Sequence, residues 1–188
     1  MDFTLSPEIE SLRVRTRAFV EEHVLPLESD PHNFSEHENI PDERLNPVRE
    51  KAKKAGLWAP QSPKEYGGMD LPMVAWAVMY EEAARSLFGP LAFNCMAPDD
   101  GNMNVLKKLG TPAQKEKWLK PIVEGKVRSS FAMTEPAPGG GSDPSMIKTY
   151  AEKHGDKWKI YGRKWFITGA AAASHFILAA RTSDDKRK

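Results

Sequence analysis

The sequence contains a single cysteine, Cys95, among its 188 residues. One thiol cannot form an internal disulfide or a zinc site built from several cysteines, so we expect Cys95 to be a free thiol in the core. Long apolar runs are also missing. No stretch approaches the roughly 20 apolar residues that cross a bilayer, and the first residues lack a run of signal-peptide length. These absences predict a soluble cytoplasmic protein.

The chain also lacks an excess of charge of either sign. It has 27 Lys and Arg against 26 Asp and Glu, for a formal net charge of +1. This balance gives no electrostatic reason to expect a nucleic-acid or membrane partner, so the expected partner is a small molecule. The five histidines, His23, His32, His37, His154 and His175, show no metal-site spacing, and no metal is predicted.

Helical periodicity fills the first two thirds of the chain. Ser6 can cap a first helix with Pro7 at its first position, and this helix should end near Leu25. Gly56 suits the end of a second helix. The second to fifth helices are expected over 44–55, 72–86, 99–109 and 113–125, with a loop at 28–43. Asp99 or Asp100 can cap the fourth helix, and Thr111 with Pro112 opens the fifth. The short connections predict an antiparallel helical bundle over 1–127.

Glu81 and Glu82 are adjacent within the third of these helices. Neighbouring residues on a helix point about 100° apart, so the two carboxylates cannot share a proton as a catalytic pair. We expect both to lie on a solvated face.

The hydrophobic period changes from 3.6 to 2 near Lys126, which predicts strands. The expected strand segments are 127–134, 146–155, 156–169 and 174–181, with a hairpin turn at Gly155 and Asp156. The predicted fold class is therefore α+β, with a partial antiparallel β domain over 128–188. A sheet of so few strands is marginal unless something covers its faces and edges.

Two stretches of this second part are unusual. FAMTEPAPGGGSD at 131–143 holds three consecutive glycines, whose exposed N–H groups can form a concavity for anionic or carbonyl oxygens. The stretch lacks the spacing of a P-loop or a dinucleotide fingerprint, and a purely structural turn explains it equally well. GRKWFITGA at 162–170 is expected to be a strand, in which Trp165 and Phe166 point to opposite faces. The aromatic ring that faces away from the core offers a surface for a flat ligand.

Together with APQSPKEYGGMDL at 59–71, NCMAPDDGNMNVLKKLGT at 94–111 and QKEKWLKPIVEGK at 114–126, these stretches resemble the acyl-CoA dehydrogenase family across essentially the whole chain. The resemblance implies an oligomeric flavoprotein with an amino-terminal helical domain, a small β domain and a carboxy-terminal helical domain. Only the first domain and part of the second match this sequence. The implied cofactor is FAD, the substrate an acyl-CoA that becomes 2,3-unsaturated, and the electron acceptor an electron-transferring flavoprotein.

The resemblance also assigns cofactor contacts. Thr134 would bond the flavin ring near N5, and Ser142 would contact the flavin diphosphate or the acyl-CoA. The full set of cofactor contacts is Phe131, Met133, Thr134, Gly141, Ser142, Phe166, Ile167 and Thr168. The loop between Thr134 and Ser142 is two residues longer than in the medium-chain enzymes.

No catalytic residue is assigned, because the family's glutamate base lies in the carboxy-terminal domain. We expect Glu135 to bond backbone in its turn instead, and we expect this chain alone to be inactive. Two alternatives stay open. The chain could be a flavin-free binding or assembly subunit that pairs with a separate carboxy-terminal polypeptide, or a truncated inactive product.

Overall fold

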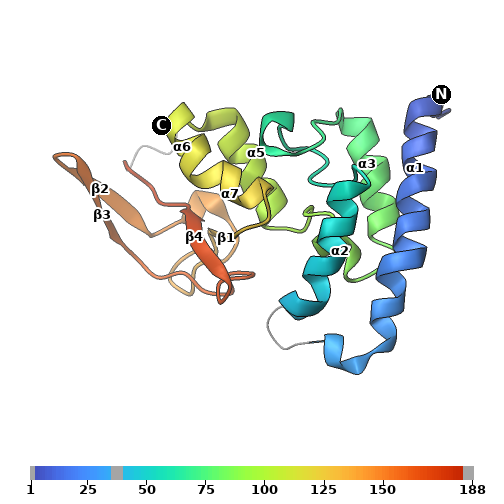
Figure 1. Cartoon of the computed structure of the whole chain (residues 1–188). Helices are drawn as coiled ribbons and strands as arrows, with labels where there is room; N and C mark the ends of the chain where they lie inside the picture. The colour runs from blue at the N-terminus through green and yellow to red at the C-terminus, as the bar shows by residue number, and fades with distance from the viewer. Residues whose placement is uncertain (1–2, 35–39, 184–188) are drawn as a thin grey trace. The chain divides into compact units, whose positions relative to one another are not determined.

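The computed structural model describes residues 3–34 and 40–183 (Figure 1). The chain divides into two compact units, Met1–Val127 and Arg128–Lys188. The first unit is helical, and the named strands lie in the second. Within the described ranges, no helix is both long and apolar enough to span a membrane.

The α-helices of the first unit follow the predicted order. They are α1 (Pro7–Phe19), α2 (Asp42–Lys54), α3 (Met73–Ala83), α4 (Gly89–Ala92), α5 (Asp99–Leu109), α6 (Pro112–Gln114) and α7 (Lys120–Val123). A π-helical segment, η1 (Val20–Val24), extends α1, and a second, η5 (Lys115–Leu119), joins α6 to α7. The short 3₁₀ turns are η2 (Leu25–Ser29), η3 (Pro31–Asn33) and η4 (Lys64–Tyr66). Only α4 was not predicted, since its four residues are too few to show a period.

The helix ends confirm most of the predicted signals. The Ser6 hydroxyl accepts a hydrogen bond from the Ile9 N–H at 3.4 Å, and Thr111 forms a capping box with Gln114. Gly56 has φ 67°, the left-handed conformation expected after α2. The prediction that Asp99 or Asp100 caps α5 is wrong, because both lie inside the first turn.

The core of the first unit is one apolar cluster contributed by most of its helices. Its largest fully buried side chains include Phe88, Phe93 and Met79. Trp58 is also buried, and its indole N–H donates to the Val123 carbonyl at 2.7 Å. Cys95 is a buried free thiol as predicted, and burial raises the pKa of that thiol.

The prediction for Glu82 is wrong. Glu81 is exposed, but Glu82 is only 3% exposed and accepts two hydrogen bonds from Arg17, at 2.9 and 2.7 Å. Adjacent residues of a helix point in different directions, so Glu82 faces α1 while Glu81 faces solvent. Helix α1 packs against α3 (Figure 1). The hydrogen bond from Arg17 lowers the pKa of Glu82.

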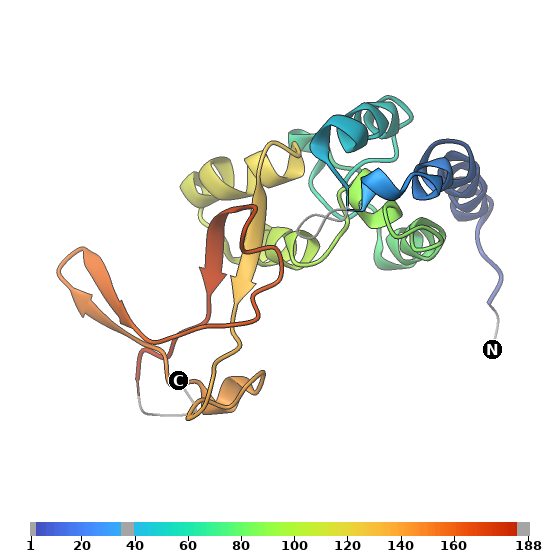
Figure 2. The ribbon, with the colours of Figure 1, turned by 90° about the horizontal axis from the view of Figure 1, so that it is seen from below.

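The second unit contains two separate strand pairs (Figure 2). Its strands are β1 (Arg128–Ala132), β2 (Tyr150–His154), β3 (Lys157–Tyr161) and β4 (Ala173–Leu178), and a 3₁₀ turn, η6 (Pro144–Met146), follows the glycines. The β2–β3 hairpin is antiparallel as predicted, with Tyr150 opposite Tyr161. β1 and β4 instead pair in parallel, which corrects the prediction of a wholly antiparallel domain. Two parallel strands both start at the same end of the pair, and the connection between β1 and β4 is long enough for the chain to return to that end.

The segment 162–170 is not the predicted strand. β3 ends at Tyr161, and the next six residues have no regular structure. Gly162 with φ 154° and Phe166 with φ 51° depart from the extended conformation that a continuous strand requires. Apolar periodicity alone does not reveal such breaks.

Candidate functional site

The two segments predicted to contact a cofactor lie side by side in the second unit. The Trp165 N–H donates to the Thr134 carbonyl at 3.1 Å, and the Ser130 hydroxyl donates to the Thr168 carbonyl at 2.8 Å. Because the first bond joins residues 134 and 165 and the second joins 130 and 168, the two segments are antiparallel, and residues 131–134 face residues 165–168. The structure therefore brings the predicted residues together, although the second segment is not a strand.

Apolar side chains near this contact remain accessible. Ala132 is buried, whereas Phe131 beside it in β1 is 40% exposed and Met133, just after β1, is half-buried. Phe166 is 80% exposed, and its ring centroid lies 4.6 Å from that of Trp165. A planar ligand can pack on such surfaces.

The hydroxyl groups of the site are available to a ligand. Within the part of the chain that the structure describes, the hydroxyls of Thr134, Ser142 and Thr168 form no hydrogen bond to protein. The Thr134 N–H is also without a protein acceptor there. These groups fit a heterocycle whose edge carries both donors and acceptors, because a hydroxyl can act as either.

The glycine loop folds back on the end of β1. The Glu135 N–H donates to the Gly141 carbonyl at 3.0 Å. Among the described residues, the N–H groups of Gly140 and Ser142 donate to no protein acceptor, whereas Gly141 pairs with Glu135 in an antiparallel bridge. Free N–H groups of this kind suit the oxygens of a phosphate or a carbonyl.

Steric and conformational limits explain two of the glycines. A Cβ added to Gly139 would lie 2.6 Å from both Cβ and Oε2 of Glu135, so a larger residue would displace that side chain. Gly141 has φ 62°, which disfavours other residues. Glycine is therefore favoured at both positions where the loop closes over Glu135.

Glu135 is a buried junction within the second unit. Its carboxylate accepts hydrogen bonds from the Lys148 N–H at 2.7 Å, the Thr149 N–H at 2.9 Å and the Lys164 ammonium at 2.8 Å. Burial alone would raise the pKa of Glu135, but the hydrogen bond from Lys164 and those from the 148–149 segment lower it to about 2. Glu135 bonds backbone as expected and is held ionised.

Lys164 is the residue that sequence reasoning missed. Besides Glu135, its ammonium donates to the Met133 carbonyl at 2.8 Å. Only 9% of its side chain is exposed. A lysine between Arg163 and Trp165 gives no pattern that distinguishes a buried cation from a solvated one, so the sequence carried no signal.

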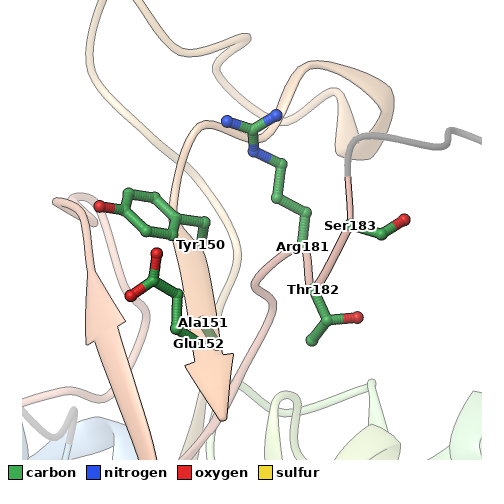
Figure 3. Close-up of a pocket in the computed structure, with 6 residues that line it drawn as sticks. All are labelled: Tyr150, Ala151, Glu152, Arg181, Thr182 and Ser183. Carbon is green, nitrogen blue, oxygen red and sulfur yellow. The ribbon is translucent and has the colours of Figure 1, made fainter. Parts of the chain in front are cut away.

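Two cavities lie beside the hairpin. One, of about 390 Å³, is lined by residues that include Pro136, Pro138, Tyr161 and Arg163. The other, of about 320 Å³, is lined by Tyr150, Ala151, Glu152, Arg181, Thr182 and Ser183 (Figure 3). None of the predicted cofactor contacts lines either cavity.

Comparison with known proteins identifies both units. Residues 6–126 match the profile of the acyl-CoA dehydrogenase N-terminal domain, and residues 130–188 match that of the middle domain. A Mycobacterium tuberculosis protein named as a probable acyl-CoA dehydrogenase is 37% identical over 98% of this chain and 46% of its own length.

Solved structures show the same likeness. A Mycobacterium abscessus protein assigned to the acyl-CoA dehydrogenases has a TM-score of 0.85 at 34% identity, covering 97% of this chain and 48% of its own. The FAD complex of PigA has a TM-score of 0.75 at 25% identity, covering 99% of this chain and 46% of its own. The chain thus spans a little under half the length of each of these three proteins.

Proposed function

Because the chain belongs to the acyl-CoA dehydrogenase family, we propose that it forms the amino-terminal and central parts of an FAD-dependent enzyme. The reaction proposed is 2,3-dehydrogenation of an acyl-CoA thioester in fatty acid metabolism. The observation that carries the proposal is the antiparallel contact of residues 131–134 with 165–168, which gathers unpaired hydroxyls beside exposed aromatic rings.

The residues of the first segment would bind and orient the isoalloxazine ring. Phe131 is exposed and Met133 is half-buried, and both would offer apolar contact to the ring. Thr134 follows directly, and its free N–H and hydroxyl would bond the ring edge near N5. Bound FAD would supply the hydride acceptor for the substrate β carbon.

The second segment and the loop would complete the contacts made by this chain. Phe166, Ile167 and Thr168 would line the ring from the neighbouring segment, with the Thr168 hydroxyl as the polar contact. Gly141 and Ser142 would contact the flavin diphosphate or the acyl-CoA, with the free N–H of Ser142 as a donor. These contacts would also exclude water from the ring edge.

The base that removes the substrate α proton is proposed to lie outside this chain. Glu135, the acidic residue next to Thr134, is buried, ionised and fully engaged by Lys164 and backbone donors. The rest of the catalytic site is therefore assigned to a carboxy-terminal domain. An electron-transferring flavoprotein is the proposed acceptor, and the working form is a homo-oligomer or a complex with a complementary chain.

Titration of FAD fluorescence tests the proposal. The wild-type chain should quench the fluorescence saturably, and the double variant T134V and T168V should bind FAD more weakly, because each substitution keeps the side-chain shape but removes a hydroxyl. S174A is the matched control, because Ser174 is another exposed hydroxyl of the same unit, outside the proposed contacts. Quenching that is equal in all three proteins would contradict the assigned site.

A further inference from the structure

We infer that Lys164 is a positioning residue for the flavin site, which it would serve without touching the flavin. This inference rests on the proposed function for the identity of the ligand. The observation behind it is that one buried ammonium binds the chain on both sides of Thr134.

Lys164 reaches two acceptors that flank Thr134 in the sequence. Its Nζ lies 2.8 Å from the Met133 carbonyl and 2.8 Å from Oε1 of Glu135. The backbone bond from the Trp165 N–H to the Thr134 carbonyl lies between these contacts. The residue before Thr134, Thr134 itself and the residue after it are thus all tied to residues 164–165.

Glu135 connects the segment around Thr134 to two other parts of the second unit. Its carboxylate holds the N–H groups of Lys148 and Thr149 at the start of the hairpin, and its own N–H holds the glycine loop at Gly141. An ammonium in a low-dielectric site strengthens these contacts, because the carboxylate stays ionised beside it. Removal of the Lys164 charge would loosen the first segment and the loop together.

A role in positioning explains the pair better than stability alone. The side chains of Lys164 and Glu135 are 9% and 4% exposed, so desolvation offsets much of their attraction. Buried pairs of this kind contribute conformational specificity in some proteins. Here the specified conformation leaves the Thr134 hydroxyl and N–H unpaired, with its carbonyl engaged by Trp165.

The experiment compares K164M and E135Q with the wild type, using E82Q as a matched control. Glu82 and Glu135 are both 3% exposed, and each accepts a hydrogen bond from a cationic side chain, Arg17 and Lys164 respectively. Glu82, however, belongs to the first unit. The first readout is amide hydrogen exchange at Glu135 and Trp165 in the chain without flavin. The second is the dissociation constant for FAD, measured by fluorescence titration.

We expect K164M to speed exchange at both amides and to raise the dissociation constant about tenfold or more, as the loss of charge-assisted hydrogen bonds implies. E82Q should lower the melting temperature yet change both readouts less than about twofold. Unchanged exchange in K164M would overturn the inference. Faster exchange with unchanged FAD affinity would overturn it as well.

Two further outcomes are decided by the same set of proteins. If K164M does not fold, E135Q is judged by the same criteria, since it keeps the side-chain shape and removes the charge that Lys164 binds. If the wild-type chain retains no flavin, the proposed function fails. Amide exchange alone then decides whether Lys164 fixes the segment, with unchanged rates against it and faster rates for it.

Discussion

The Trp165 N–H donates to the Thr134 carbonyl at 3.1 Å and joins two residues that lie 31 positions apart in the sequence. This bond orients the Thr134 peptide with its carbonyl toward residue 165, while its N–H and hydroxyl stay free of protein partners in the described residues. The proposed flavin contact depends on this division of the polar groups.

Removal of the Thr134 hydroxyl should weaken FAD binding without unfolding the chain. T134V keeps the volume and branching of the side chain and loses one hydrogen bond, so the dissociation constant should rise about three- to tenfold. Titration of FAD fluorescence measures this change. A matching thermal melt should show little loss of stability, because the hydroxyl has no protein partner to leave unpaired.

An alanine at Gly139 should destabilise the second unit. Its Cβ would overlap the Glu135 side chain, and such overpacking typically lowers the free energy of unfolding by about 1–3 kcal/mol. Urea denaturation measures the free energy of unfolding. G101A is the control, because a Cβ on Gly101 in α5 meets nothing within 4 Å, and alanine there should stabilise the helix by about 1 kcal/mol. Equal stability of G139A and the wild type would contradict the tight loop.

Glu82 should matter far more to stability than its neighbour Glu81. E82A leaves Arg17 without its buried partner and should lower the free energy of unfolding by about 2–4 kcal/mol. E81A removes an exposed side chain and should change it by less than about 0.5 kcal/mol. Urea denaturation of both variants measures the contrast, and similar values would contradict the observed burial.

The stability of the second unit should fall in acid as Glu135 takes up a proton. The pKa of Glu135 is about 2 in the folded chain, against an ordinary value of 4.5. Because the folded pKa is the lower one, the stabilisation is fully present above about pH 4.5 and is lost as the pH falls toward 2. E135Q should lack this component, so the stability difference between it and the wild type should shrink across that range. A difference that stays constant with pH would contradict the lowered pKa.

The helical unit could be predicted from the sequence because its signals are local. Ser6, Gly56 and Thr111 each act through neighbours within a few residues, and the structure confirms all three. Glu82 was mispredicted because its partner Arg17 lies on another helix, far away in the sequence. The short-range pattern of a helix contains no such information.

The candidate site was predicted only in part. The resemblance named eight residues within 131–142 and 166–168, and the structure brings 131–134 and 165–168 together. The parallel β1–β4 pair depends on how a long connection returns, and the left-handed Phe166 ends the extended run that apolar residues suggested. Lys164 was missed because burial of a lysine depends on distant acceptors, here the Met133 carbonyl and Glu135.

The visible absorption spectrum of the purified chain, mixed with FAD and then desalted, tests the central claim most directly. If Phe131 to Ser142 and Phe166 to Thr168 hold the cofactor, the protein fraction should retain both flavin absorption bands. T134V should retain less flavin at the same protein concentration. A folded but colourless wild-type protein would contradict the claim that these residues hold FAD, and would favour a flavin-free subunit or a truncated inactive product.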